Sequence, residues 1–306
     1  MLENHTAGSP MQQKIIWTDL TPQQIQEMLM ERDLYVSEHI VRQLLRDAGY
    51  RVRQMLKYLD MGEHPDRNAQ FENIARIKDL YRNSANPLVS IDTKKKELLG
   101  TYYRDGKVYC QQPLLAYDHD FPSHAEGVVI PYGIYDLKRN FGYISVGTSH
   151  DTSEFACESV AWWWTDHGRK HYPNADSICL LCDGGGSNSA NKYLFKEDLQ
   201  KLANRLGIEI RVAHYPAYCS KYNPIERRLF PHVTRACQGV LFDSVATVKR
   251  LLEKTCTATG LGVVVEVLDK VYQTGRTYTE GFKEDMKILF DEILPKWNYR
   301  AVPLSA

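Results

Sequence analysis

The chain has 306 residues, of which 43% are hydrophobic and 25% are charged, and its formal net charge is zero. This composition is typical of a globular protein with room for two domains, and it excludes disordered, collagen-like and miniature disulfide-rich proteins. No apolar run approaches the roughly 20 residues that cross a bilayer, and the N-terminus lacks the basic and apolar regions of a secretion signal. We therefore expect a cytoplasmic protein without a membrane partner.

The N-terminal region, residues 1–60, is predicted to form a small helical unit. Thr21 and Gln24 have the spacing of a capping box at the start of one helix, and a second helix is expected between Ser37 and Gly49. A basic second helix suggests a helix-turn-helix, although an ordinary helical hairpin fits equally well. Basic residues in and after this helix are candidates for DNA contacts: Arg42, Arg46 and Arg53.

A linker helix is predicted within residues 61–86, and the pattern changes from residue 87 onward. Strands are expected at residues 88–92, 97–103, 141–146, 177–182 and 208–213, and helices at 151–170, at 193–206 and from 223. Strands that then alternate with helices predict a mixed sheet with helices on both faces. The core domain is expected at residues 87–240, and residues 241–306 are expected to form an α/β extension that ends in a helix.

Two of the seven cysteines, Cys179 and Cys182, form a CxxC pair, which could indicate zinc or redox chemistry. Both lie in a predicted buried strand, in which residues three apart face opposite ways, and no second CxxC pair is present. His167 and His171 have the spacing of a zinc helix but lack its following glutamate. We therefore expect a buried strand and a solvated helix end rather than metal sites.

Two acidic residues lie at the ends of predicted strands. Asp92 ends the first strand, and Asp183 follows the buried strand just before a run of three glycines. Ligands collect beyond the carboxyl ends of the strands of open α/β sheets. If the two strands are neighbours, their carboxylates would repel each other and raise one pKa, and a divalent cation would remove this repulsion. Oxygen ligands favour Mg²⁺ or Mn²⁺ over zinc.

Glu226 is the third candidate acid. It stands at the third position of a predicted helix that begins with Asn223 and Pro224, where glutamate commonly caps its own helix. The same position could instead direct the carboxylate to the edge of the sheet, and the spacing does not choose between a cap and a ligand. Further candidates for DNA contacts are basic residues near these acids: Lys94, Lys95, Lys221, Arg227 and Arg228.

Three segments that contain these acids resemble the acidic motifs of the ISAzo family of insertion-sequence transposases. The segments are residues 90–98, 182–188 and 220–230, and residues 216–226 are also similar to a stretch of the Tc/mariner transposases. The order of the motifs agrees with that of the family over most of the chain. The family belongs to the DDE transposases, so the resemblance implies a ribonuclease H-like fold.

The resemblance also implies a metal-dependent enzyme that cleaves DNA at the ends of a mobile element and joins the freed 3′ ends to target DNA. Asp92, Asp183 and Glu226 would be the catalytic residues and would hold Mg²⁺ or Mn²⁺. The partners would be the element ends, the target DNA and further copies of the chain, assembled on DNA in the nucleoid. Residues 1–60 are short for the family, and we expect a truncated DNA-binding region there.

Two other functions remain open from the sequence. The chain could be a catalytically inactive DNA-binding remnant or regulator, in which case the three acids need not converge. It could also be a nucleotide-binding α/β enzyme that uses the glycines at 184–186, although the Walker pattern and the GxGxxG fingerprint are both absent. The positions of the three carboxylates in the folded chain would separate these alternatives.

Overall fold

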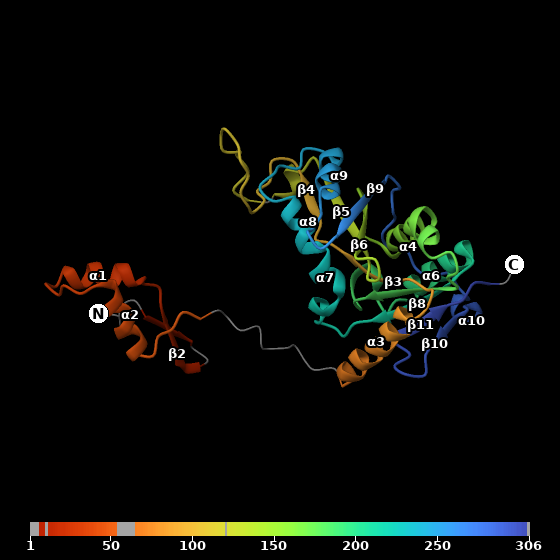
Figure 1. Ribbon diagram of the computed structural model, residues 1–306, viewed down its shortest axis with the longest axis horizontal. Helices are drawn as coiled ribbons and strands as arrows, with labels where there is room; N and C mark the ends of the chain where they lie inside the picture. The colour runs from red at the N-terminus through yellow and green to blue at the C-terminus, as the bar shows by residue number, and fades with distance from the viewer. Residues whose placement is uncertain (1–5, 10–11, 54–64, 120, 305–306) are drawn as a thin grey trace. The chain divides into compact units, whose positions relative to one another are not determined.

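The structure is a computed structural model that describes residues 6–9, 12–53, 65–119 and 121–304 (Figure 1). The chain divides into two compact units, Met1–Met61 and Gly62–Ala306. Among the described residues, no helix combines the length and the apolar character that crossing a membrane requires.

The N-terminal unit contains a β hairpin in addition to the two expected helices. Its elements are the antiparallel strands β1 (Thr6–Ser9) and β2 (Gln12–Thr18) and the helices α1 (Pro22–Met30) and α2 (Glu38–Asp47). The capping box of Thr21 and Gln24 is present, and the Ser37 side chain caps α2. The predicted helical unit omitted the hairpin, whose second strand carries a short run rich in β-branched and aromatic residues at 15–18.

The second unit is built on one mixed sheet. Its strands are β3 (Leu88–Thr93), β4 (Glu97–Leu99), β5 (Gly127–Asp136), β6 (Phe141–Gly147), β7 (Ser177–Cys182), β8 (Glu209–His214), β9 (Gly262–Leu268), β10 (Ile288–Phe290) and β11 (Asn298–Ala301). Their order is β10-β11-β8-β7-β3-β5-β6-β9, and β4 pairs with β5. β3, β5 and β6 form an antiparallel meander, and β7 and β8 continue the sheet parallel to β3.

These five central strands have the ribonuclease H order, which confirms the predicted ribonuclease H-like mixed sheet. The strands that lead to Asp92 and Asp183 are neighbours, with Ser90 opposite Leu181. The C-terminal residues extend the same sheet at both edges, because β9 pairs with β6 and β11 pairs with β8. The helix predicted at the end of the chain is wrong: α10 (Phe282–Asp285) is a single turn, and β10 follows it.

The strand β5 has ten residues and was not among the predicted strands. Pro131 lies inside it, and proline is rare within central strands because it lacks a hydrogen-bond donor. The carbonyl oxygen of Pro131 accepts a hydrogen bond from the Lys94 N–H at 2.9 Å, just beyond Thr93, the last residue of β3. The missing N–H of Pro131 therefore faces the end of β3. The proline lies just beyond the last residue pair between β3 and β5, Thr93 with Tyr132, so it removes no hydrogen bond from the middle of that pairing.

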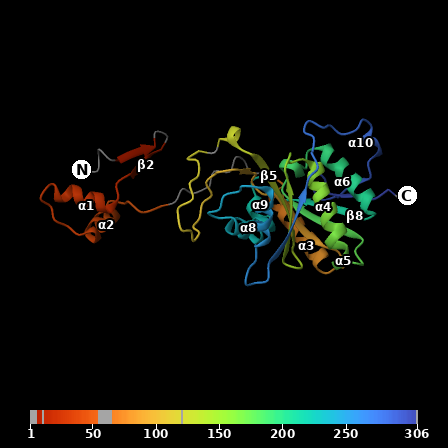
Figure 2. The same ribbon diagram turned by 90° about the horizontal axis from the view of Figure 1, so that it is seen from above.

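Helices cover both faces of the sheet, as predicted (Figures 1 and 2). One face carries α3 (Arg67–Arg82), α7 (Pro224–Arg228), α8 (Phe230–Ala236) and α9 (Val245–Glu253), and the other carries α4 (Ser153–Trp163) and α6 (Tyr193–Leu206). The two faces have separate hydrophobic clusters. Cys179 belongs to the cluster under α3 and Cys182 to the cluster under α4 and α6, so the CxxC pair does face opposite ways.

The helix α3 packs directly on the sheet. Ile74 and Ile77 are buried in a cluster with Leu88 of β3. The Tyr81 hydroxyl and Ser177 Oγ are 2.6 Å apart in a buried hydrogen bond, which attaches the C-terminal end of α3 to the first residue of β7. The predicted linker helix is therefore part of the second unit.

The position of α7 depends on the glycine in the middle of β5. A methyl carbon added at Gly133 would lie 2.7 Å from Ile225 Cδ1 and 2.7 Å from Phe230 Cε1. We predict that Gly133→Ala lowers the free energy of unfolding by about 1–3 kcal/mol, because the Ile225 and Phe230 side chains must shift to make room for the added carbon. Urea denaturation measures this change.

Gly185→Ala is the matched control for Gly133→Ala, because an added methyl group there meets nothing within 4 Å. It should change the free energy of unfolding by less than about 0.5 kcal/mol. Equal effects of the two substitutions would contradict the close packing of α7 on Gly133.

Candidate functional site

Three carboxylates converge where the central strands end. Asp92 lies near the end of β3, Asp183 directly follows β7, and Glu226 is the third residue of α7. All three side chains are half-buried. The carboxyl groups of Asp92 and Glu226 share a hydrogen bond, and the charge of Asp183 acts on both. The structure therefore brings together the three acids that the sequence singled out.

The pKa of each of the three carboxyl groups is raised. Burial, followed by the charge of Asp183, raises the pKa of Asp92 to about 8, although the Thr93 N–H donates to Asp92 Oδ1 at 2.8 Å and opposes the shift. Burial is also the main cause of the raised pKa of Asp183 and of Glu226. A proton held between Asp92 and Glu226 would limit the repulsion among the three groups.

The chemistry of these donors suits a divalent metal ion. The three groups offer only oxygen atoms, which Mg²⁺ and Mn²⁺ prefer, and their mutual repulsion is a cost that a cation removes. In the part of the chain that the structure describes, no group of three or more His, Cys, Asp and Glu side chains is already arranged to hold a metal. Binding an ion would therefore require the three side chains to change their arrangement, and the raised pKa of Asp92 means that its proton would also have to be released.

A fourth acid, Asp151, lies beside the three and was not a predicted site residue. The Thr93 hydroxyl donates to Asp151 Oδ1 at 3.1 Å, and the charge of Asp151 raises the pKa of Asp183. The following helix was expected to begin at residue 151, but α4 begins at Ser153 and is capped by Thr152, whose side chain accepts from the Phe155 N–H at 3.2 Å. The signal was available, because β6 runs parallel to β3 and its end therefore reaches the same edge of the sheet.

A buried hydrogen-bond network attaches α7 to β3. Ser90 lies two residues before the first acid, so it faces the same side of the sheet, and its hydroxyl donates to Oδ1 of the fully buried Asn223. Asn223 Nδ2 donates to the Ile91 carbonyl oxygen at 3.2 Å, and the Ile225 N–H donates to Ser90 Oγ at 3.0 Å. The Asn223 side chain does not cap α7. The capping box that was the alternative role for Glu226 is therefore absent.

His214 supports the backbone at Asp183 and was missed in the sequence. It is fully buried at the end of β8, and burial lowers its pKa to about 4. The neutral ring is consistent with Nδ1 donating to the Asp183 carbonyl oxygen at 2.8 Å and with Nε2 accepting from the Tyr299 hydroxyl at 2.9 Å. Its place at the carboxyl end of a parallel strand was the signal that could have identified it.

Most of the basic residues predicted to contact DNA are exposed. These are Arg42, Arg46, Arg53, Lys95, Lys221, Arg227 and Arg228. Lys94 is the exception, because its side chain is only 13% exposed and its Nζ pairs with Glu97 at 2.8 Å, and its contact with DNA stays a prediction. The charge of Lys94 instead lowers the pKa of Glu226.

The three glycines after Asp183 do not lead into a long helix. They are followed by a single 3₁₀ turn, Gly186–Asn188, so the helix N-terminus that a nucleotide site requires is absent from this described segment. Gly184 instead packs against the Trp297 ring, which would lie 3.1 Å from an added methyl carbon.

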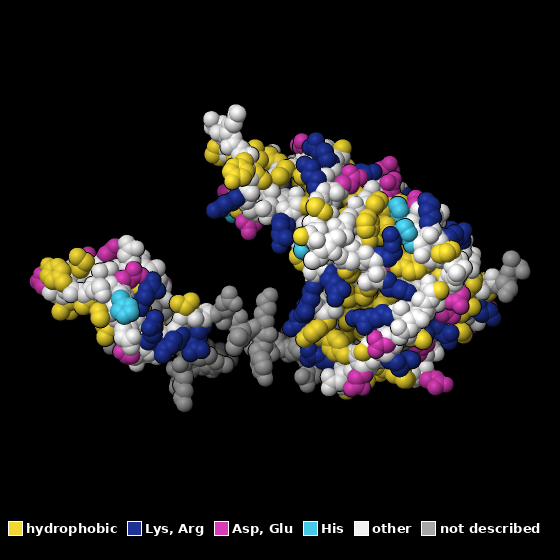
Figure 3. All heavy atoms as spheres, viewed as in Figure 1, with side chains coloured by type: hydrophobic (Ala, Val, Ile, Leu, Met, Phe, Trp, Pro, Cys, Tyr) yellow, Lys and Arg dark blue, Asp and Glu magenta, His cyan; other side chains and the backbone are white. Residues whose placement is uncertain are grey.

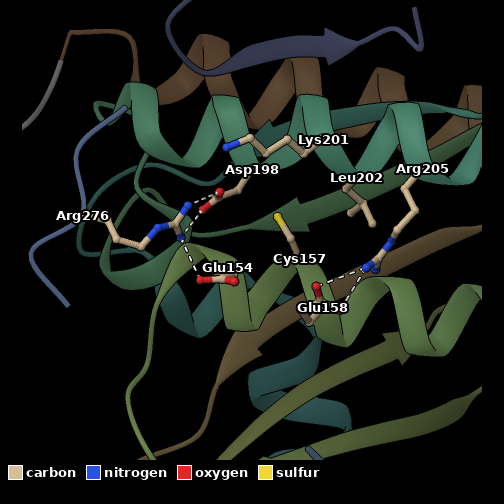
Figure 4. Close-up of a pocket in the computed structure, with 8 residues that line it drawn as sticks. All are labelled: Glu154, Cys157, Glu158, Asp198, Lys201, Leu202, Arg205 and Arg276. Atoms are coloured by element: carbon tan, nitrogen blue, oxygen red, sulfur yellow. Dashed lines mark hydrogen bonds and ion pairs between the residues drawn. The ribbon is translucent and has the colours of Figure 1, made fainter. Parts of the chain in front are cut away.

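A separate cavity of about 200 Å³ lies between α4 and α6 (Figure 4). Most of its charged side chains pair with one another, and Lys201 pairs with Glu197 outside the cavity. Arg276 bonds Glu154 at 3.1 Å and Asp198 at 2.8 Å, and Arg205 bonds Glu158 at 3.1 Å. We interpret this cavity as a set of ion pairs that joins the two helices.

The sequence model of a family described as "Rhodopirellula transposase DDE domain" matches residues 1–303. The Mos1 transposase paired-end complex with left transposon end has a TM-score of 0.48 and 17% identity over 81% of this chain and 72% of that chain. A pre-cleavage Mos1 transpososome has a TM-score of 0.47 and 16% identity over the same shares of the two chains. A Mos1 mariner paired-end complex with Mn has a TM-score of 0.45 and 17% identity, again over 81% and 72%. No curated protein has a significant match.

The bond between Ser90 and Asn223 should be visible as energetic coupling. Ser90→Ala and Asn223→Ala should each lower the free energy of unfolding by about 1–3 kcal/mol, because each leaves buried polar partners unsatisfied. The double variant should lose less than the sum of the two by about 0.5 kcal/mol or more, as measured by urea denaturation. Ser90→Ala combined with Ser244→Ala, which removes the distant cap of α9, should be additive. Additive losses at Ser90 and Asn223 would contradict the network.

The raised pKa of Asp92 predicts a specific dependence of stability on pH in metal-free buffer. Its folded value, about 8, exceeds the ordinary value of 3.8, so between these pH values the folded state holds a proton that the unfolded state has lost. Stability therefore falls as pH rises across this window. Asp92→Asn cannot ionise, and its melting temperature should exceed that of the wild type by several degrees at pH 8 and by little at pH 4.

Asp118→Asn serves as the control for this pH series, because the Asp118 side chain is 87% exposed. Its melting temperature should follow that of the wild type at every pH, as scanning calorimetry can determine. A pH-independent difference between Asp92→Asn and the wild type would show that Asp92 is not protonated in the folded, metal-free protein.

Proposed function

The chain belongs to the family of Rhodopirellula transposase DDE domains, as the sequence resemblance predicted, and from this premise we propose that it cleaves DNA at the ends of a mobile element and transfers the ends to target DNA. The observation that carries the proposal is the convergence of Asp92, Asp183 and Glu226 at the edge of the sheet. The three acids come from elements far apart in sequence, and each is half-buried despite its charge. Such an arrangement is costly without a catalytic or metal-binding role.

Asp92, Asp183 and Glu226 are the proposed ligands of Mg²⁺ or Mn²⁺. A pair of such ions, when bound, would activate the oxygen that attacks the phosphodiester and would stabilise the oxygen that leaves it. The oxygen-only donor set and the raised pKa of all three groups support this assignment.

The neighbouring residues of the chain would keep the three acids in place. The Ser90–Asn223 network holds the first turn of α7 against β3, so Glu226 stays directed at Asp92. His214 fixes the backbone carbonyl of Asp183 and remains neutral, so it adds no charge to the site. In-line transfer depends on such positioning, since small displacements of reacting groups have large effects on rate.

The exposed basic residues are the proposed contacts with DNA phosphates. In the N-terminal unit these are Arg42, Arg46 and Arg53, and in the second unit Lys95, Lys221, Arg227 and Arg228. We also propose that copies of the chain act together on DNA, because cutting and joining involve two element ends and a target.

A catalytically inactive DNA-binding regulator is the second candidate. It is favoured by one observation, that the described residues contain no preformed group of three metal-ligating side chains. It predicts DNA binding without cleavage at any concentration of Mg²⁺ or Mn²⁺.

The test is the cleavage of a labelled duplex that carries the element's own end, in the presence of Mg²⁺. Glu226→Gln keeps the size of the side chain but removes its charge, so folding should persist. Cleavage should fall by at least about a hundredfold, since loss of even an outer partner of a metal ligand costs about 10–100-fold. Asp92→Asn and Asp183→Asn should behave in the same way.

Glu253→Gln, an exposed substitution on α9, is the matched control and should cleave like the wild type. Glu226→Gln protein that cleaves at the wild-type rate would remove Glu226 from the site. A wild-type protein that binds the element's end but never cuts it would favour the inactive regulator.

A further inference from the structure

A basic groove lies between α3 and α7, on the face of the sheet opposite α4 and α6. It encloses about 290 Å³, and five of its eight lining residues are cations, whereas none is acidic. The lining residues are Lys78, Arg82, Leu137, Lys138, Tyr222, Pro224, Arg227 and Arg228. Lys and Arg side chains gather over α3 and α7 in the space-filling view (Figure 3). We call this hollow the α3–α7 groove.

The walls of the α3–α7 groove are held in place by contacts of two of its lining residues, Lys138 and Tyr222, with α3 and the segment that follows it. Lys138 Nζ donates to backbone carbonyl oxygens at the C-terminal end of α3, those of Tyr81, Ser84 and Asn86, at 3.3, 2.8 and 3.1 Å. Near the N-terminal end of α3, the Phe71 ring meets Tyr222 edge-on, with ring centroids 5.0 Å apart. Four of the five cations therefore lie on the helices α3 and α7, and the fifth, Lys138, lies in the turn between β5 and β6 and is tied to α3.

The positive charges in the groove are poorly compensated. Burial, followed by the charges of Arg82 and Arg228, lowers the pKa of Lys78. Asp79 pairs with Arg82 at 3.1 Å, but both side chains are more than half exposed, and an exposed pair contributes little. Five neighbouring cations repel one another, and an anion in the groove would relieve that repulsion.

We propose that the α3–α7 groove binds the sugar–phosphate backbone of the DNA substrate and leads it to the three acids. Lys78 and Arg82 are one helical turn apart on α3, about 6 Å along its axis, so the cations form a row that suits a polyanion better than a single phosphate. Pro224 and Arg227 lie close to Glu226 on α7, so this end of the groove approaches the candidate site. The other end, at Lys138, lies beside the start of β3, at the opposite edge of the sheet. The inference rests on the proposed function, because DNA is the substrate there.

The test uses the full chain with Lys78→Gln and Arg82→Gln combined, in metal-free buffer. Fluorescence anisotropy measures binding to two duplexes, one with the element's end and one of unrelated sequence, over a range of salt. Each lost phosphate contact should weaken binding about tenfold at 0.1 M salt and reduce the salt slope by about 0.9. The loss should be equal for the two duplexes, because phosphate contacts carry no sequence information.

Arg250→Gln combined with Lys254→Gln is the matched control. These two cations are exposed, have the same i, i+4 spacing and lie on and just after α9, away from the groove. The control should bind both duplexes like the wild type, with an unchanged salt slope. Unchanged binding by the groove variant, an equal loss in the control or a loss confined to one duplex would each overturn the proposal.

The outcome is separable from that of the proposed function, because the measurement requires no cleavage. A wild-type protein that binds DNA through the groove but cannot cut it would end the enzymatic proposal and leave this inference standing. Metal-dependent cutting that is lost in Glu226→Gln, together with unchanged DNA binding by the groove variant, would end this inference alone. Melting temperatures within about 2 °C of the wild type would show that the groove variant is folded.

Discussion

The repulsion among half-buried carboxylates is the constraint on which the rest of the second unit depends. Asp92, Asp183 and Glu226 would separate if their supports were loose, because each is more stable in water than beside the others. The chain meets this demand with rigid elements: two adjacent strands, a helix tied to one of them by Asn223, and a neutral histidine behind the other. The proton retained on Asp92 reduces the cost that remains.

The sequence predicts those parts of the fold and site that depend on local pattern. Buried strands show as apolar runs, and acids at their carboxyl ends are expected at one edge, so Asp92 and Asp183 are found without knowledge of the topology. The strand β5 is hard to predict because Pro131, a residue rare within central strands, lies inside it, and the proline is tolerated because its missing N–H faces the place where β3 ends. The hairpin that begins the N-terminal unit is too short to stand out from the polar residues around it.

Other parts depend on contacts between residues far apart in sequence. Asn223 has the pattern of an ordinary helix cap, yet its side chain bonds Ser90, more than a hundred residues earlier. Lys94 has the pattern of an exposed lysine, yet it folds back on Glu97. The α3–α7 groove joins cations that are individually unremarkable in sequence, since Lys78 and Arg228 become neighbours only when both helices pack on one face of the sheet.

The close packing of α7 on Gly133 has a consequence for how members of this family are judged from sequence. The three acids can all be present in a chain whose α7 packs less well on the sheet, because one extra carbon at position 133 would meet the Ile225 and Phe230 side chains. If the three acids carry the proposed chemistry, their presence alone would therefore not identify a working copy. Gly133, which lies opposite α7, and Asn223, which precedes α7, should therefore be considered together with the acids when functional mobile elements are distinguished from decayed ones.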